Sequence, residues 1–484
     1  MEQTHFDVLI VGAGLSGIGA AVHLQTNCPS KSYAILEARD CIGGTWDLFR
    51  YPGIRSDSDM YTLGYSFRPW TEPKAIADGP SILTYICETA QAYGVDRHIR
   101  FGHRVQKVRW STEQARWTVE VVDGATGLTR KLTCGFLLTC TGYYAYDKGY
   151  TPEFQGRERF GGTVVHPQNW PADIDHAGKR VVVIGSGATA VTLVPALAKR
   201  AAHVTMLQRS PTYIATMPER DRIGGWLRGR MPSAPAYAIT RWKNALLAMG
   251  FYAFTRRYPQ RARKLLISQV KKQVGPGVDI DTHFTPTYDP WDQRLCLVPD
   301  GDLFDTLREG RASVVTDQIE TFTETGLRLK SGQELAADII VTATGLRLQF
   351  LGGVALEVDG RRLEPSTLMT YKGMMCSDVP NFALVVGYTN ASWTLRGDLT
   401  CEHVCKLLNY MDARGFAVCV PRRDPSVKEE PLLGLTAGYV QRSIAAFPRQ
   451  GDRAPWNVHQ NYALDRLSLR LASIDDGSLI FSKR

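Results

Sequence analysis

A glycine-containing turn near the middle of the chain has the residue types and spacing that bind a pyrophosphate. Gly185, Gly187 and Ala190 follow the apolar run Val181–Ile184, which we expect to be a buried parallel strand, and a helical pattern over 188–198 comes next. The first glycine permits a tight turn, the second lets a pyrophosphate approach bare backbone, and the small third residue lets helix and strand pack closely. The helix N-terminus then faces the anion, so this turn is predicted to bind a dinucleotide.

The same arrangement occurs at the start of the chain. Gly12, Gly14 and Gly17 follow the strand-like run Phe6–Val11, and Glu37 ends the next strand-like run, 25 positions after Gly12. A dinucleotide-binding fold places at this point the carboxylate that accepts a hydrogen bond from a ribose hydroxyl. A glycine triplet alone would be weak evidence, but strand, triplet, helix, strand and terminal acid together predict a second dinucleotide site.

The two turns differ at the position that recognises the ribose. Arg209 lies 24 positions after Gly185, where the first turn has Glu37. An arginine cannot accept a proton from a ribose hydroxyl, but it can pair with a 2′-phosphate. A surface arginine without a ligand is the alternative. The exchange of acid for arginine predicts NADPH at the second turn and a dinucleotide without a 2′-phosphate at the first.

A linker before the second turn carries a resemblance to a known family. It has Phe160, Gly162, His166, Trp170 and Pro171 at the spacing F-x-G-x-x-x-H-x-x-x-W-P. This pattern resembles the fingerprint of the type I Baeyer–Villiger monooxygenases, flavoenzymes that insert oxygen beside a ketone. The Trp-Pro ending separates that family from ordinary flavin-containing monooxygenases. The linker itself shows no pattern of helix or strand.

The resemblance covers nearly the whole chain. The segments Gly43–Trp70 and Tyr288–Phe304 are similar to an actinobacterial branch that includes the ethionamide-activating monooxygenase. The resemblance implies FAD at the first turn, NADPH at the second, and O2 as a substrate. It implies conversion of ketones to esters or lactones through a flavin peroxide, with sulfoxidation of thioethers or thioamides as a further activity.

The resemblance also assigns catalytic residues. Arg294 matches the family's active-site arginine, a fixed cation that would stabilise negative charge, and Asp57 matches its ionic partner. The alternatives are a surface ion pair for Arg294 and a helix cap for Asp57. His166 is expected to organise domain movement rather than to transfer a proton, although imidazole can do both. Gln293 stands where some members have a basic residue, which removes one expected phosphate contact.

The expected cofactor contacts extend along both turns and the neighbouring loops. Around FAD we expect Gly12, Gly14, Ser16, Gly17, Glu37, Gly44, Thr45 and Trp46, and Arg55, Ser56, Asp57 and Val105 are further expected cofactor contacts. Around NADPH we expect Gly185, Ser186, Gly187, Ala188, Thr189, Ala190, Arg209 and Ser210. No metal site is expected. Cys41 has no second cysteine nearby, which argues against the dithiol chemistry of the related disulfide reductases.

Two other functions remain open on the residues alone. One is a flavin monooxygenase that oxidises only nitrogen or sulfur, against which Trp170, Pro171 and Arg294 argue. The other is a flavin-binding redox sensor without enzymatic activity. A sensor would be expected to lack the stabilising cation or to have a broken second glycine motif, and the chain has neither defect.

The elements that carry these residues form a weak internal repeat. Strand-like runs at 104–110, 116–122 and 135–140 lead to Thr141-Gly142, and a similar series ends at Thr344-Gly345. We therefore predict an α/β protein with two nested Rossmann-like domains and a helical insertion in the second. The predicted domains are residues 1–146 with 347–484 for FAD, 147–217 with 293–346 for NADPH, and 218–292 for the insertion. A helix is expected over 401–412, and the tail from 431 could cover the site.

Charge and composition indicate which class of protein and which binding partners to expect. With 44% hydrophobic and 22% charged residues the 484-residue chain is expected to be globular, and its ten scattered cysteines predict reduced thiols in the cytoplasm. The net charge of +9 is concentrated between 222 and 272, which hold twelve basic residues and no acidic one. A solvated helical insertion is the first interpretation, and peripheral contact with the inner face of the cell membrane is the second. Nucleic acid is not expected as a partner, and the oligomeric state stays open.

Overall fold

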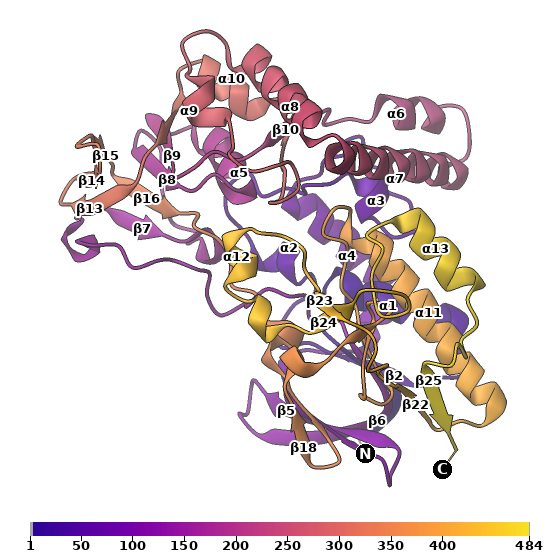
Figure 1. The fold of residues 1–484 in the computed structure, drawn as a ribbon. Helices are drawn as coiled ribbons and strands as arrows, with labels where there is room; N and C mark the ends of the chain where they lie inside the picture. The colour runs from indigo at the N-terminus through magenta and orange to yellow at the C-terminus, as the bar shows by residue number, and fades with distance from the viewer. Residues whose placement is uncertain (1–2, 484) are drawn as a thin grey trace.

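The first glycine turn belongs to a mixed sheet of nine strands (Figure 1). The computed structural model describes residues 3–483 of the chain. The strand order is β18-β17-β4-β5-β6-β1-β2-β3, with β21 beside the second half of β6. The strands are β1 (His5–Val11), β2 (Tyr33–Leu36), β3 (Ile99–Arg100), β4 (His103–Ser111), β5 (Arg116–Asp123), β6 (Thr129–Thr139), β17 (Ala355–Val358), β18 (Arg361–Leu363) and β21 (Phe382–Leu384).

The core of this sheet is parallel. β1 pairs with β2 and with the second half of β6 in parallel, whereas β4, β5 and the first half of β6 form an antiparallel meander. β6 is longer than the strand expected over 135–140 because its first half pairs with β5. The helices beside this sheet are α1 (Leu15–Asn27), α2 (Thr45–Leu48), α3 (Met60–Leu63) and α4 (Gly79–Ala92).

The second glycine turn belongs to a separate parallel sheet of five strands in the order β12-β9-β8-β16-β7. Its elements are β7 (Thr163–Val165), β8 (Arg180–Ile184), α5 (Ala188–Leu197), β9 (His203–Gln208), α10 (Asp302–Arg308), β12 (Ala312–Thr316) and β16 (Ile339–Thr342). A small antiparallel sheet adjoins it, made of β13 (Ile319–Thr323), β14 (Gly326–Leu329) and β15 (Glu334–Ala336). The expectation that the fingerprint linker has no secondary structure is wrong, because β7 lies within it and pairs with β16. A three-residue edge strand is too short to show a period.

The two turns are built in the same way, which confirms the predicted α/β fold with two Rossmann-like modules. Gly12 has φ +103°, and a Cβ there would lie 2.7 Å from the carbonyl oxygen of Cys140. Gly185 has φ +138°, and a Cβ there would lie 2.4 Å from the carbonyl oxygen of Ala343. Each turn thus begins against the end of the strand that closes its own module, and only glycine fits both the space and the dihedral angle.

The region between β10 (Ile214–Met217) and β11 (Cys296–Pro299) is helical. These two strands pair in parallel, so the chain leaves and re-enters at one place. The helices are α6 (Arg222–Arg228), α7 (Ser233–Arg257), α8 (Pro259–Val274) and α9 (Ile280–Phe284). α7 packs on α3 of the first module, where the buried Arg241 donates hydrogen bonds to the carbonyl oxygens of Tyr61, Thr62 and Gly64.

After Gly345 the chain returns to the first module. α11 (Trp393–Arg414) starts eight residues before the helix expected over 401–412, because its first two turns are buried and carry no simple amphipathic pattern. Gly415, at φ +66°, ends it. The remaining elements are β19 (Thr370–Tyr371), β20 (Met375–Cys376), β22 (Val418–Pro421), β23 (Glu429–Pro431), α12 (Gly438–Gln441), β24 (Arg449–Gly451), α13 (Tyr462–Leu471) and β25 (Leu479–Ser482). Among residues 3–483 no helix is both long and apolar enough to cross a membrane.

Two crossing segments connect the modules, and they run side by side. The outgoing segment is 143–150 and the returning segment is 343–349. The N–H of Ala145 donates to Arg347 O at 2.9 Å, and the N–H of Gln349 donates to Tyr143 O at 2.8 Å. The N–H of Tyr150 donates to Gly345 O at 3.0 Å. Thr141-Gly142 directly precedes the outgoing segment, and Thr344-Gly345 lies near the start of the returning one.

Candidate active site

A cavity of about 1430 Å³ is lined by both glycine turns and both crossing segments. Pockets for a single small ligand usually measure about 300–1,000 Å³. This cavity can therefore hold more than one ligand at a time. Residues of the tail also reach it, including Tyr439 and Arg442 from the region of α12.

The first turn presents bare backbone to the cavity. A Cβ on Gly44 would lie 3.1 Å from the Cα of Gly14, so the two glycine loops touch. The buried Glu37 carboxylate accepts hydrogen bonds from the N–H groups of Ala13, at 2.6 Å, and Arg39, at 2.9 Å. The carboxylate thus braces the turn while it lines the cavity, in the place expected for a ribose contact.

The second glycine turn has more free space beside its backbone than the first glycine turn. A Cβ on Gly187 would meet no atom within 4 Å, so a phosphate has free access to this backbone. The hydroxyl of Ser186 donates to Ser210 O at 3.1 Å, which ties the turn to the end of β9. Arg209 lies beside Ser210, is exposed, and makes no salt bridge to any residue within 3–483. Its guanidinium is available to an anion in the cavity.

Arg294 and Asp57 form an ion pair in the cavity wall. Nη2 of Arg294 lies 2.8 Å from Oδ2 of Asp57, and each side chain is about one-third exposed, at 31% and 37%. The Asp57 carboxylate raises the pKa of Arg294 above its ordinary value, against the opposing effect of burial. Arg294 therefore remains a cation at any working pH, with part of its fork facing the cavity.

Asp57 is not the helix cap that the sequence left open. The cap of α3 is Asp59, whose carboxylate accepts a hydrogen bond from the N–H of Thr62 at 3.1 Å. Asn244 of α7 donates a further hydrogen bond to the same carboxylate at 2.8 Å. Asp59 therefore caps α3, whereas Asp57 pairs with Arg294.

A tight turn and the tail hold Arg294 in place. The turn closes with a hydrogen bond from the N–H of Asp292 to Asp289 O, and Trp291 within it has φ +71°, which is rare for a non-glycine residue. The N–H of Thr436 donates to Asp292 O at 2.7 Å. The tail from 431, expected to cover the site, therefore supports the loop that carries the arginine.

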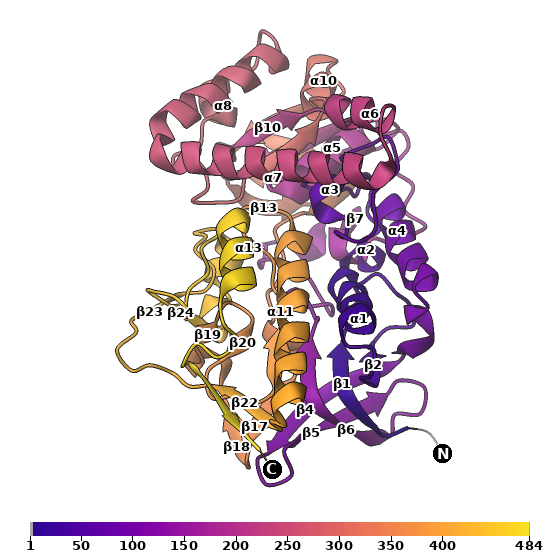
Figure 2. The same cartoon turned by 90° about the vertical axis from the view of Figure 1, so that its right-hand side faces the viewer.

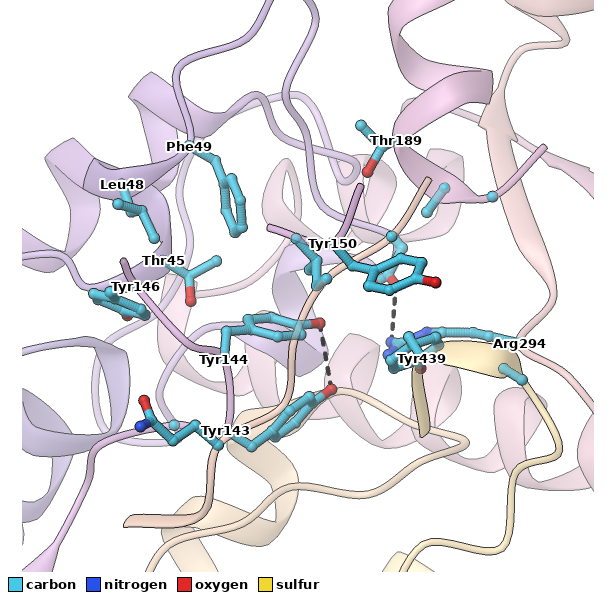
Figure 3. Close-up of a pocket in the computed structure, with 18 of the residues that line it drawn as sticks. Thr45, Leu48, Phe49, Tyr143, Tyr144, Tyr146, Tyr150, Thr189, Arg294 and Tyr439 are labelled. Atoms are coloured by element: carbon cyan, nitrogen blue, oxygen red, sulfur yellow. Dashed lines mark hydrogen bonds and ion pairs between the residues drawn. The ribbon is translucent and has the colours of Figure 1, made fainter. Parts of the chain in front are cut away.

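Tyrosines surround the ion pair. Figure 3 shows Tyr143, Tyr144, Tyr150 and Tyr439 among the residues that line the cavity together with Arg294. The hydroxyl groups of Tyr143 and Tyr144 are 3.4 Å apart, and burial raises the pKa of Tyr439 to about 12. These tyrosines were not among the predicted site residues. The run YYAYDKGY directly after Thr141-Gly142 was a usable signal for three of them, whereas the tail residue gave none.

The cavity brings together most of the predicted residues. Its lining includes Gly12, Gly14, Ser16, Glu37, Gly44, Thr45, Trp46, Arg55, Ser56, Asp57, Val105, Gly185, Ser186, Gly187, Ala188, Thr189, Arg209, Ser210 and Arg294. Three predicted residues are not part of the lining: Gly17, Ala190 and His166. A Cβ on Gly17 would lie 1.8 Å from Gly12 O, and Ala190 is fully buried, so both serve the packing of helix on strand.

Known proteins resemble this chain over its whole length. It is 57% identical to the FAD-containing monooxygenase EthA of Mycobacterium tuberculosis over 482 residues, which cover 99% of this chain and 98% of that protein. It is 50% identical to the probable FAD-binding monooxygenase AlmA of Acinetobacter baylyi, covering 100% and 97%. The chain belongs to the FAD-containing monooxygenases. The flavoprotein monooxygenase class predicted from the motifs is thereby confirmed.

Two further comparisons describe the fold of this FAD-containing monooxygenase. A solved steroid monooxygenase bound to NADP matches with a TM-score of 0.78 at 24% identity and covers 99% of this chain and 100% of that chain. An open structure of cyclohexanone monooxygenase matches with a TM-score of 0.75 at 18% identity, covering 99% and 100%. The family description that matches residues 9–236 is pyridine nucleotide-disulphide oxidoreductase.

The cysteines of this FAD-containing monooxygenase form no disulfide within residues 3–483. All ten cysteines are free thiols. Cys41, beside the first glycine loop, donates a hydrogen bond to Asp47 at 2.9 Å. Burial, with help from that carboxylate, raises the pKa of Cys41 to about 11. Cys41 does not line the cavity, but Cys140 and Cys296 do, and burial raises the pKa of both thiols above the ordinary value. A thiol that stays protonated is a poor nucleophile, which argues against dithiol chemistry in the cavity.

His166 contacts both crossing segments of the monooxygenase. Its Nδ1 accepts a hydrogen bond from the N–H of Gln168 at 3.1 Å, so the proton is on Nε2, which donates to Gly345 O at 3.2 Å. A Cβ on Gly149 would lie 2.0 Å from the ring, so the outgoing segment passes directly over the imidazole. Burial lowers the pKa of His166 below its ordinary value.

The lowered pKa of His166 predicts that the stability of the folded protein depends on pH. Because the folded-state pKa of His166 lies below the unfolded value of about 6.5, the unfolded chain takes up more protons as the pH falls through that value, and stability is lost on the acid side. We expect the melting temperature of the His166→Asn variant to fall less between pH 7.5 and pH 5.5 than that of the wild type. Thermal melting at fixed protein and FAD concentration measures this difference. If the melting temperatures of both proteins fell equally, His166 would not be a cause of the loss of stability at low pH.

Proposed function

We propose that the protein is an NADPH- and O2-dependent Baeyer–Villiger monooxygenase that converts ketones to esters or lactones and also oxidises thioethers or thioamides. The observation that carries the proposal is the Arg294–Asp57 ion pair in a cavity shared by two dinucleotide turns. A monooxygenase that attacks a ketone must stabilise negative charge on oxygen, and a permanent cation at the reacting centre does this without a titration step.

The residues present fit both cofactors. FAD would lie along the first turn, with its pyrophosphate at the N-terminus of α1, its ribose at Glu37 and its remaining length beside the contact of Gly14 with Gly44. NADPH would lie along the second turn, with its pyrophosphate on the bare backbone at Gly187 and its 2′-phosphate at Arg209. When bound, this pair supplies hydride transfer and activation of O2.

The chain's own residues would stabilise the charge that develops during the reaction and would shield the cavity from water. The guanidinium of Arg294 would donate hydrogen bonds to the oxygen on which charge develops, and Asp57 would orient it through the contact at 2.8 Å. The surrounding tyrosines exclude water from that side of the cavity. His166 keeps the crossing segments together, which maintains the second module against the first. It acts as a positioning residue because it does not line the cavity.

The two sheets support a division of the chain into domains. We infer that residues 1–146 and 347–484 bind FAD, that 147–217 and 293–346 bind NADPH, and that 218–292 form the insertion. The return of β17 and β21 to the first sheet supports the discontinuous first domain. The parallel pair β10–β11 at the base of α6–α9 supports the limits of the insertion.

The experiment is NADPH consumption under air with linear, cyclic and aryl ketones and with a thioether, together with product analysis. We expect an ester or lactone in amounts that match the NADPH consumed. Sulfoxide without any ester would favour a monooxygenase limited to nitrogen and sulfur. Tight FAD binding without NADPH oxidation would favour the redox sensor.

A further inference from the structure

Three helices carry large apolar side chains that the fold leaves uncovered. α6, α7 and α13 lie on the side of the molecule that faces the viewer in Figure 2. The exposed fractions of these side chains run from 49% for Ile239 to 77% for Leu471. We call the set the apolar helix face, and it consists of Ile223, Trp226, Ile239, Leu246, Leu247, Leu464, Leu467 and Leu471.

The spacing of these residues shows that they are not scattered. On α13, Leu464, Leu467 and Leu471 recur at intervals of three and four, which places them on one side of the helix, while Tyr462 and Leu469 pack inward. On α7, every exposed residue between 234 and 253 is apolar or glycine. A solvated surface helix would carry charged residues on that side.

Direct contacts join the helices into one surface. The rings of Trp242 on α7 and Tyr462 on α13 are 5.2 Å apart, and the guanidinium of Arg466 lies over Trp242 at 5.3 Å. Lys243 of α7 pairs at 2.6 Å with Asp221, which caps α6. The exposed apolar residues of α7, α13 and α6 therefore belong to one continuous face.

The border of this face is positively charged. Arg222, Arg230 and Arg257 are exposed, and Arg230 lies over the ring of Trp226 at 4.4 Å. Two acidic residues near the face are paired, Asp221 with Lys243 and Glu402 with Arg470, whereas Glu72 beside α6 and Asp475 after α13 are exposed. Basic residues therefore outnumber unpaired acidic ones at the border of this apolar surface along α6 and α7.

We propose that the apolar helix face docks on an anionic lipid surface, with α7 and α13 lying in the plane of the interface. The leucines and Trp226 would enter the boundary between headgroups and acyl chains, and the bordering arginines would pair with lipid phosphates. A second copy of this chain fits less well. A two-fold dimer through this face would bring identical basic borders together, and like charges repel.

The test is co-flotation of the FAD-loaded protein with vesicles of phosphatidylglycerol and phosphatidylcholine, compared with vesicles of phosphatidylcholine alone. We expect binding to the anionic vesicles that weakens with added salt. The variant L246Q/L247Q/L464Q/L467Q is expected to bind at least about 10-fold more weakly, because it removes four inserted side chains. The variant R222Q/R230Q/R257Q is expected to lose about 10- to 100-fold on anionic vesicles only.

The matched control is Leu128→Gln, which changes a leucine of 63% exposure at the turn between β5 and β6, away from the apolar helix face. It is expected to bind vesicles like the wild type. None of the changed residues lines the cavity, so NADPH oxidation in vesicle-free buffer reports correct folding of every variant. A wild type that does not float with anionic vesicles, or a quadruple variant that floats equally well, would overturn the proposal. A dimer in sedimentation that the quadruple variant loses would assign the face to a second copy instead.

Discussion

Ester formation is expected to fall by about 10²–10³ when Arg294 is replaced by alanine, roughly 3–4 kcal/mol, because one preorganised donor to the developing oxyanion is lost. The cation stabilises charge that is present in the transition state and absent from the neutral ketone, so its loss lowers the rate of that step. FAD should stay bound, because Arg294 is not part of the first glycine turn and the turn's backbone is unchanged in the variant. NADPH should still be oxidised, with the reducing equivalents released as hydrogen peroxide.

Two further variants sharpen this prediction. Arg294→Lys should restore little activity, because an ammonium on a flexible stem cannot reproduce the planar fork beside Asp57. Arg157→Ala, a change at an exposed residue that does not line the cavity, should behave like the wild type. Ester and hydrogen peroxide are measured beside NADPH consumption. Ester formation by the alanine variant with unchanged coupling would remove Arg294 from the mechanism and revive the enzyme limited to nitrogen and sulfur.

The Michaelis constant for NADPH is expected to rise about 10- to 100-fold in the Arg209→Ala variant, on the order of 1.5–3 kcal/mol for a charge-assisted contact. The side chain is exposed beside the second turn and makes no salt bridge within residues 3–483, so its removal leaves no protein charge unpaired there. The Michaelis constant for NADH should hardly change, because NADH has no 2′-phosphate.

Steady-state kinetics with both nucleotides test this prediction. Arg200→Ala is a suitable control, because Arg200 belongs to the same module but pairs with Asp175 at the surface. A variant of Arg209 that kept the wild-type preference for NADPH would show that the 2′-phosphate is bound elsewhere in the cavity.

Local spacing made the two glycine turns predictable. The requirements of a phosphate-binding turn fall on consecutive residues, so Gly12, Gly185 and their followers could be identified without knowledge of the fold. The pairing of Asp57 with Arg294 had no such signal. The two residues are far apart in the sequence, and only the resemblance linked them.

Other features depended on tertiary structure. Tyr439 reaches the cavity because the tail folds back over the first module, and no local pattern encodes that path. The first two turns of α11 are buried on nearly all sides, so they lack the amphipathic period that predicts a helix. β7 has three residues at a sheet edge and depends on β16 for its hydrogen bonds.

The paired crossing segments have a consequence for cleavage of the chain. A protease that cut within 143–150 would divide the first module's sheet between two fragments, because β6 lies before the cut and β21 and β17 lie after it. Those strands pair with β6 and β4, and 343–349 would still join the second module to the C-terminal fragment. The nicked protein should therefore stay assembled under native conditions and separate only on denaturation, and the second module could not be released by any single cut.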